Sequence, residues 1–183
     1  KQDSLSLQTA DLLVDEVERL NRSISELLDY ARPAKLEVRN LEIDELLAKS
    51  LMLVRSDAEA GSIVIEESYY CGACQIMGDE DKLTQVMLNL CLNSLQAMAD
   101  GGTLKISTSM EEKWAVVEIA DNGCGIAPEI TTKIFEPYFT TKHGGTGLGL
   151  AMSAKIIDDH KGQIQISSDQ GRGTTVSVKL RLS

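Results

Sequence analysis

Carboxamide side chains recur in one stretch of the sequence at a spacing that places them on one side of a helix. Gln85, Asn89 and Asn93 step by four through DKLTQVMLNLCLNSLQAM, residues 81–98, while the apolar residues of this stretch form a separate broad face. An amide oxygen is a hard ligand suited to Mg²⁺, which usually bridges to phosphate oxygens as well. A buried amide without a partner costs about 1–3 kcal/mol, so the stripe faces either water or a polar ligand.

A second segment, HGGTGLGL at residues 143–150, is rich in glycine and continues into an apolar helical run. Two familiar phosphate loops do not fit it. A Walker loop ends in Gly-Lys-Ser/Thr, and a dinucleotide fingerprint directly follows an apolar strand, whereas Gly145, Gly147 and Gly149 are spaced by twos after FTTKH. A flexible loop leading into a helix N-terminus near Leu148 would favour an anion. A linker followed by a core helix fits this segment equally well.

A third segment, DNGCGI at residues 121–126, follows an apolar strand pattern. Gly123 and Gly125 would let the backbone approach a flat ring, and Asp121 could accept a hydrogen bond from an exocyclic amine such as adenine N6. A hydrogen bond to a charged group contributes about 1.5–3 kcal/mol. A tight turn closed by the Asp121 side chain is the alternative for this segment.

The order of these segments resembles a known family. NLCLNSLQAM, DNGCGI, IFEPYFTTK, GGTGLGL and GRGTTV resemble the N box, first glycine box, F box, second glycine box and terminal glycine motif of bacterial sensor histidine kinases. Their ATP-binding catalytic domain has the Bergerat ATPase fold, shared with the gyrase B subunit, MutL and a heat-shock chaperone. The resemblance covers roughly residues 35–181, and QAM and PYFTTK are similar to the NtrB-like, ZraS-like class.

The resemblance implies a role for individual residues. Asn93 would coordinate Mg²⁺ with support from Asn89, and Lys142 would be the cation for the γ-phosphate of ATP. Asp121 would hold the adenine amine. The other residues that it places around the nucleotide are Gly123, Gly125, Ile126, Phe135, Thr141, Gly145, Thr146, Gly147, Leu148, Gly149 and Thr174.

Helical and strand patterns alternate irregularly along the rest of the chain. We expect helices at about 44–60, 80–99, 129–135 and 148–160, and strands at about 63–67, 75–77, 103–109, 114–120, 163–168 and 174–181. This order favours the α/β class, as a two-layer α/β sandwich with a mixed sheet. The sheet would form a catalytic domain over residues 34–183, preceded by one long helix.

That helix is predicted for residues 1–32, where apolar residues from Leu13 to Ala31 recur at steps of four and three. Pro33 ends it. Such a seam needs a partner, so we interpret it as a dimerisation or docking element; packing on its own globular domain is the alternative. It resembles the second helix of the dimerisation and histidine-phosphotransfer hairpin, which gives a partial domain at residues 1–33.

Composition limits the function classes. The net charge of −10 argues against nucleic acid, and no apolar run reaches the roughly 20 residues of a membrane span. The chain begins with Lys1 inside a helical pattern, so we expect a piece of a longer protein, with membrane segments or a sensor elsewhere. We expect this portion to be cytoplasmic and the full-length protein to be a membrane-anchored homodimer.

The cysteines leave a further question. Cys71-Gly-Ala-Cys74 has the spacing of half a zinc site or of a redox pair, but no second pair follows and both histidines are distant in sequence. We therefore expect two incidental thiols in a turn, in a reducing compartment, with a metal or redox sensor as the alternative.

These observations predict the ATP·Mg-binding core of a two-component sensor histidine kinase, which passes the γ-phosphoryl group to a histidine for relay to a response-regulator aspartate. His143 and His160 do not fit the family's phosphoacceptor position, so that histidine is expected on a helix absent from this chain. The alternatives are another ATPase or serine kinase of the same fold, and a helical dimerisation module that carries a degenerate nucleotide fold.

Overall fold

A computed structural model of the chain describes residues 35–72, 74–142 and 145–183, together with residues 17, 24, 27 and 28. The helix predicted for residues 1–32 lies almost wholly outside the described residues, as does His143. Three residues of its predicted seam, Val17, Ile24 and Leu27, are described, and each is helical and exposed. In the described part of the chain, no helix is both long enough and apolar enough to cross a membrane.

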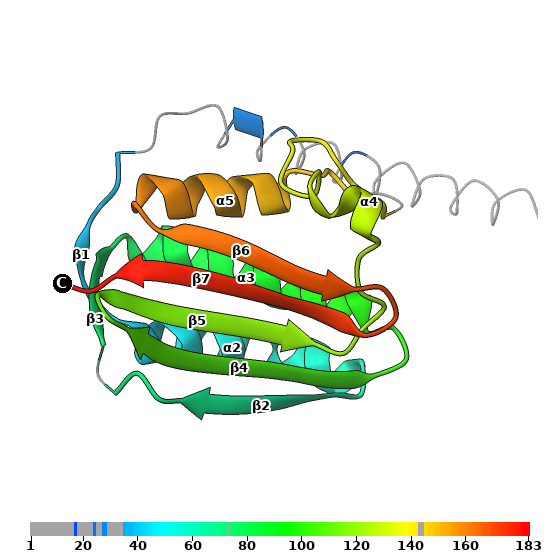
Figure 1. Cartoon of the computed structure of the whole chain (residues 1–183), viewed down its shortest axis with the longest axis horizontal. Helices are drawn as coiled ribbons and strands as arrows, with labels where there is room; N and C mark the ends of the chain where they lie inside the picture. Colours follow the sequence, from blue (N-terminus) through cyan, green and yellow to red (C-terminus); the bar gives the residue numbers. More distant parts are fainter. Residues whose placement is uncertain (1–16, 18–23, 25–26, 29–34, 73, 143–144) are drawn as a thin grey trace, which may run out of the picture.

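Two sheets organise the described residues (Figure 1). The strands are β1 (Arg39–Glu42), β2 (Ile63–Tyr69), β3 (Gln75–Gly78), β4 (Gly102–Glu111), β5 (Trp114–Asp121), β6 (Gln163–Asp169) and β7 (Gly173–Arg181). The main sheet has the order β2-β4-β5-β7-β6; β2 and β4 are parallel, and the other pairs are antiparallel. β1 and β3 form a separate antiparallel ladder. The predicted mixed sheet is confirmed.

Helices cover one face of the main sheet (Figure 1). They are α2 (Ile43–Ala60), α3 (Glu80–Ala97) and α5 (Gly149–Asp159); the short α4 (Pro128–Thr131) has no buried residue and lies outside this layer. The strands alternate between buried residues such as Ile106 and Ile119, which face these helices, and exposed residues such as Lys105 and Glu118. This alternation buries one apolar core between sheet and helices, so the predicted two-layer α/β sandwich is confirmed.

Most predicted elements occur within a few residues of their expected bounds. β1 was not predicted, because its sequence is polar and only Leu41 is buried; it forms by pairing with β3. The helix expected at about 129–135 is shorter and ends at Thr131. The helix expected to reach residue 99 ends at Ala97, where the N–H of Met98 bonds to Leu95.

Asp79 fixes the start of α3, the helix that carries the amide stripe. Its Oδ1 accepts from the N–H of Lys82 (3.1 Å), and its Oδ2 accepts from the N–H of Glu37 (2.9 Å). Burial of the carboxylate opposes ionisation, but these N–H groups outweigh it and lower the pKa of Asp79. The His160 ring accepts from the Asp79 N–H through Nε2 (2.9 Å), so this histidine supports the structure.

Candidate functional site

The two asparagines of the stripe are linked to each other and to α5. Asn89 donates from Nδ2 to Ser153 Oγ (2.8 Å), and Ser153 donates to the carbonyl of Gly149 (3.0 Å). Asn93 donates from Nδ2 to Asn89 Oδ1 at a longer distance of 3.4 Å. These contacts set the orientation of both amides, and they direct Asn93 Oδ1 away from Asn89.

Lys142 joins this chain of contacts from the F-box segment. Its ammonium donates to Asn93 Oδ1 (2.8 Å) and to Gln96 Oε1 (2.6 Å). Partial burial lowers the pKa of Lys142, and the opposing effect of the Cys124 sulfur is smaller. Lys142 and Asn93, predicted to share one site, therefore meet. Gln96 was not predicted as a site residue, although its position one turn after Asn93 on the same helix could have indicated it.

The first turn of α5 lies directly beside Asn89. A Cβ atom at Gly149 would be 2.5 Å from Asn89 Oδ1, so a larger residue here would displace the Asn89 amide. No side chain caps the helix at Leu148, whose N–H bonds to Thr146 Oγ1 (3.3 Å), and its first turn holds no acidic residue. Gly147 has a positive φ of +69° and packs on the backbone of Tyr138. The N-terminus of α5 is thus presented to an anion next to the amide stripe.

Asp121 lies at the end of β5, among residues that the sequence predicted as its neighbours. Its Oδ1 accepts from the N–H groups of Gly123 (3.0 Å) and Thr174 (3.2 Å). Ser168 Oγ bonds to Thr174 Oγ1 (2.9 Å) and accepts from the N–H of Ile126 (2.9 Å). Ser168 was missed, because nothing in the sequence distinguishes it. Among the described residues, the hydrogen bonds of the Asp121 carboxylate fall on Oδ1, which leaves Oδ2 to accept from an amine.

The glycines after Asp121 are required by the protein's own backbone. A Cβ atom at Gly123 would be 2.5 Å from the carbonyl oxygen of Ala97, and one at Gly125, which has a φ of +64°, would overlap the carbonyl oxygen of Asp169. Both glycines therefore hold the loop against the end of α3 and the turn between β6 and β7. This packing joins the loop after Asp121 to the helix that carries Asn89 and Asn93.

A groove of about 400 Å³ runs between α3 and α5. Its lining includes Gln85 and Asn89 from the stripe, with Leu148 and Gly149 from the start of α5. Gln85 is exposed, whereas Asn89 and Asn93 are half-buried. The stripe therefore faces water at its N-terminal end and polar neighbours farther along.

For three further predicted residues, the structure gives only their exposure. Thr141 and Gly145 are exposed, on either side of Lys142 in the sequence. Phe135 is half-buried, and its neighbour Ile134 is the more buried of the two. The roles predicted for Thr141, Gly145 and Phe135, like those of the other site residues named from the sequence, stay predictions.

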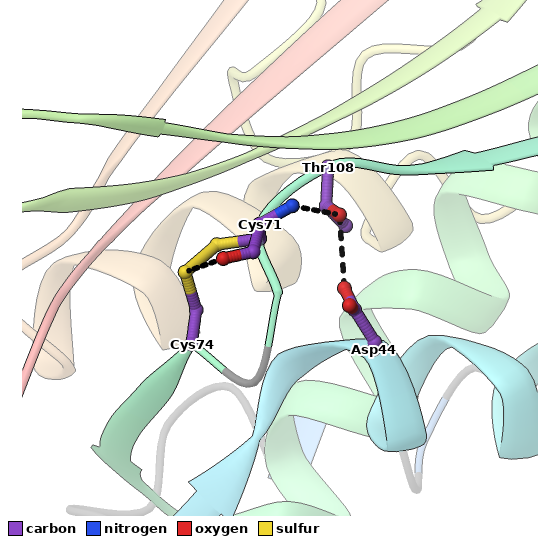
Figure 2. The surroundings of a disulfide bond; sticks show 4 residues. All are labelled: Asp44, Cys71, Cys74 and Thr108. Carbon is purple, nitrogen blue, oxygen red and sulfur yellow. Dashed lines mark hydrogen bonds between the residues drawn. A yellow bond between two sulfur atoms is a disulfide. The ribbon is translucent and has the colours of Figure 1, made fainter.

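Cys71 and Cys74 form a disulfide, so the prediction of two incidental thiols is wrong (Figure 2). The end of β2 and the start of β3 bring their Cα atoms to 5.5 Å, within the range of a disulfide. In the described ranges, no three acidic, histidine or cysteine side chains gather as a metal site. Cys91 is buried and Cys124 is exposed, and both are free thiols.

Comparison with known proteins identifies the fold. Residues 78–183, which contain both ends of the site, match the family of histidine kinase-, DNA gyrase B- and HSP90-like ATPases. The chain belongs to this ATPase family. It is 39% identical to the sensor histidine kinase ZraS of Escherichia coli K12, over 94% of this chain and 37% of ZraS. The chain thus spans less than half the length of the curated relatives it matches.

Solved structures agree with this assignment. The nucleotide-free catalytic domain of the histidine kinase ThkA matches with 28% identity and a TM-score of 0.73, over 79% of this chain and 95% of that domain. ThkA in complex with the response regulator TrrA matches with 25% identity and a TM-score of 0.81, over 94% of this chain and 50% of that one. The resemblance to sensor histidine kinases is therefore confirmed, and the ATPase domain of this chain is of the type found in two-component sensor kinases.

Proposed function

We propose that this chain binds ATP with Mg²⁺ and donates the γ-phosphoryl group to a histidine of a sensor kinase, for relay to a response-regulator aspartate. The observation that carries the proposal is the bond from the Lys142 ammonium to Asn93 Oδ1 (2.8 Å), with Asn89 joining Asn93 to the first turn of α5. It joins a positive charge, an amide oxygen and free helix N–H groups in one place, which is what a triphosphate requires.

The adenine end of the site would be the cluster around Asp121. Oδ1 is held by backbone N–H groups, so Oδ2 is oriented to accept from the exocyclic amine of adenine. Thr174 and Ile126 are fixed beside it by Ser168. The loop around Gly123 and Gly125 would form the wall of the pocket.

The phosphate end would be formed by Asn89, Asn93, Lys142 and the first turn of α5. Asn93 Oδ1 fits Mg²⁺, because it is a hard oxygen that already accepts from a cation, and its amide is held from behind by Asn89. Bound Mg²⁺ would neutralise charge on the phosphate oxygens. Lys142 would then turn from Asn93 toward the γ-phosphate, while the N–H groups after Leu148 would meet phosphate oxygens.

The partners follow from the family and from the predicted domains. Residues 1–33 would be the second helix of a dimerisation and phosphotransfer hairpin, whose first helix would carry the acceptor histidine. The complex of ThkA with TrrA supports a response regulator as the partner. We further propose that the full-length protein is a homodimer and membrane-anchored, with this portion in the cytoplasm.

Phosphoryl transfer tests this function directly. The full-length protein is incubated with Mg²⁺ and ATP labelled at the γ-phosphate, and the label on protein is tested for acid lability. An acid-labile label that Asn93→Ala abolishes would support a histidine kinase, and an acid-stable label would indicate a serine kinase instead. Glu118→Gln, a change at an exposed carboxylate of β5 on the sheet face away from the helices, is the matched control and should keep full transfer.

A further inference from the structure

The Cys71–Cys74 disulfide lies outside the proposed nucleotide site. It closes the connection between β2 and β3, and both cysteines belong to the buried core. Cys71 follows β2 where that strand pairs with Thr108 of β4, and Asp121 ends β5 opposite Leu104. The bridge and Asp121 are therefore near opposite ends of the sheet, with β3 at one end and the tip of β5 at the other (Figure 1).

The loop that carries the bridge is held in place by contacts that do not involve sulfur (Figure 2). The N–H of Cys71 donates to Thr108 Oγ1 (3.3 Å), and Thr108 donates to Asp44 Oδ1 in the first turn of α2 (2.9 Å). The carbonyl of Cys74 accepts from the N–H of Ile43 (3.1 Å). None of these three bonds involves a sulfur atom, so opening of the bridge does not require the loop to leave the domain.

The structure also holds a partner for the reduced form. The carbonyl oxygen of Cys71 lies 3.0 Å from Cys74 Sγ, where it would accept a hydrogen bond from the thiol. Tyr70 is 78% exposed, and Gly72 is exposed with open space around its Cα. Tyr70 and Gly72, on either side of Cys71 in the sequence, are therefore open to a reagent, although both cysteines are themselves buried.

The other two cysteines are differently placed. Burial raises the pKa of Cys91 to about 12, so its thiol stays neutral and is a poor nucleophile. Cys124 is exposed and remains a free thiol, in the loop that follows Asp121. The bridge thus joins the two thiols that the fold places together, while an exposed thiol elsewhere in the same chain stays unpaired.

We propose that Cys71 and Cys74 form a reversible dithiol–disulfide site, which exchanges electrons with small-molecule or protein disulfides. One thiolate attacks a disulfide RSSR and releases RS⁻, which leaves a mixed disulfide; the second thiolate then attacks the protein sulfur and releases the second RS⁻. In total the pair loses two electrons and two protons, and RSSR becomes two RSH. A dithiol reductant reverses both steps.

The element that responds to this exchange is the ladder of β1 and β3. Gln75 follows Cys74 directly and pairs with Glu42, and Ile43, which bonds to Cys74, follows Glu42. The oxidised pair therefore fixes the start of β3 and, through it, β1, where the preceding part of the chain joins the domain. This coupling does not depend on nucleotide binding, so the inference stands apart from the proposed function.

The experiment equilibrates the chain with mixtures of reduced and oxidised glutathione, traps free thiols by alkylation, and measures the peptides by mass spectrometry. Hydrogen exchange of β1 and β3 is followed in both forms. We expect a reversible change confined to Cys71 and Cys74, with exchange at Arg39–Glu42 and Gln75–Gly78 faster in the dithiol form by a factor on the order of ten. The Cys71→Ser/Cys74→Ser variant should match the dithiol form, and the Cys124→Ser control should titrate like the wild type.

Four results would overturn the proposal or its coupling to the ladder. The pair could stay a dithiol, or stop at a mixed disulfide with glutathione, at the highest ratio of oxidised to reduced glutathione. It could resist excess dithiol until the domain unfolds, which would make it a permanent structural bridge. Equal hydrogen exchange of β1 and β3 in the two forms would remove the coupling to the ladder.

Discussion

Replacement of Asp121 by asparagine separates recognition of adenine from the folding of the loop that carries it. The new side chain keeps an oxygen at the position of Oδ1, where the N–H groups of Gly123 and Thr174 can still donate. At the position of Oδ2 it has an NH₂ group, which donates and cannot accept from the adenine amine. The variant thus changes one atom toward the ligand and preserves the contacts to the protein.

The expected loss follows from the bond removed. A hydrogen bond to a charged group contributes about 1.5–3 kcal/mol, so we expect an ATP analogue to bind roughly 10- to 150-fold more weakly to Asp121→Asn. Guanine presents an acceptor, O6, where adenine presents its amine, so affinity for a GTP analogue should fall less or rise.

Calorimetric titration of both analogues, with melting curves for each variant, is the assay. Glu118→Gln is the matched control, because Glu118 is an exposed carboxylate of the same strand. Equal losses for the adenine and guanine analogues, or unchanged affinity for both with an intact fold, would refute the assignment of Asp121 to the adenine amine.

Three other substitutions test separate contacts. Gly149→Ala places a Cβ atom 2.5 Å from Asn89 Oδ1, so ATP-analogue binding should weaken about tenfold in calorimetry; unchanged affinity would contradict this contact. Lys142→Met should reduce the affinity for an ATP analogue about tenfold more than that for ADP, because it removes the cation beside Asn93; an equal loss for both nucleotides would argue against a γ-phosphate role. Asp79→Ala should cost about 1 kcal/mol at pH 7, since it removes the N-cap of α3. The pKa of Asp79 is lowered from 3.8 in the folded protein, so its contribution to the free energy of unfolding is present above pH 3.8 and is lost as the pH falls through the folded-state pKa. Denaturant titrations check this, and a stability difference between wild type and Asp79→Ala that persists in acid would contradict it.

Local signals in the sequence were sufficient for much of the fold. The capped, periodic helix that starts after Asp79 and the alternating strands around Trp114 were predicted within a few residues. β1 was not, because four polar-rich residues become a strand only when β3 lies beside them. The pairing of Cys71 with Cys74 was also missed, because their spacing suits an ordinary turn and the disulfide depends on how β2 and β3 bring the two residues together.

The arrangement of the candidate site was predictable where it follows a motif. Asn93, Lys142 and Asp121 were named from sequence, and the structure brings Lys142 to Asn93 although they are 49 residues apart. The residues that orient them were missed. Ser153 and Ser168 act through contacts that tertiary structure creates, and no local pattern distinguishes them from other serines.

The structure also gives a different explanation for the glycines that the sequence placed in the site. Gly123 and Gly125 were expected to make room for a flat ring, yet each is required by an approach of the protein's own backbone. Gly149 likewise makes room for Asn89. Glycine in these motifs therefore holds together the elements that carry Asn89, Asn93 and Asp121.

The central claim is an ATP·Mg²⁺ site built on Asn93, and calorimetric titration with a non-hydrolysable ATP analogue tests it most directly. Wild type and Asn93→Ala are titrated in Mg²⁺ and again in EDTA, with Glu118→Gln on β5 as the control outside the site. We expect wild-type binding that requires Mg²⁺ and that weakens sharply in Asn93→Ala but not in Glu118→Gln. No binding at millimolar nucleotide, or binding that ignores both Mg²⁺ and the Asn93 substitution, would contradict the account.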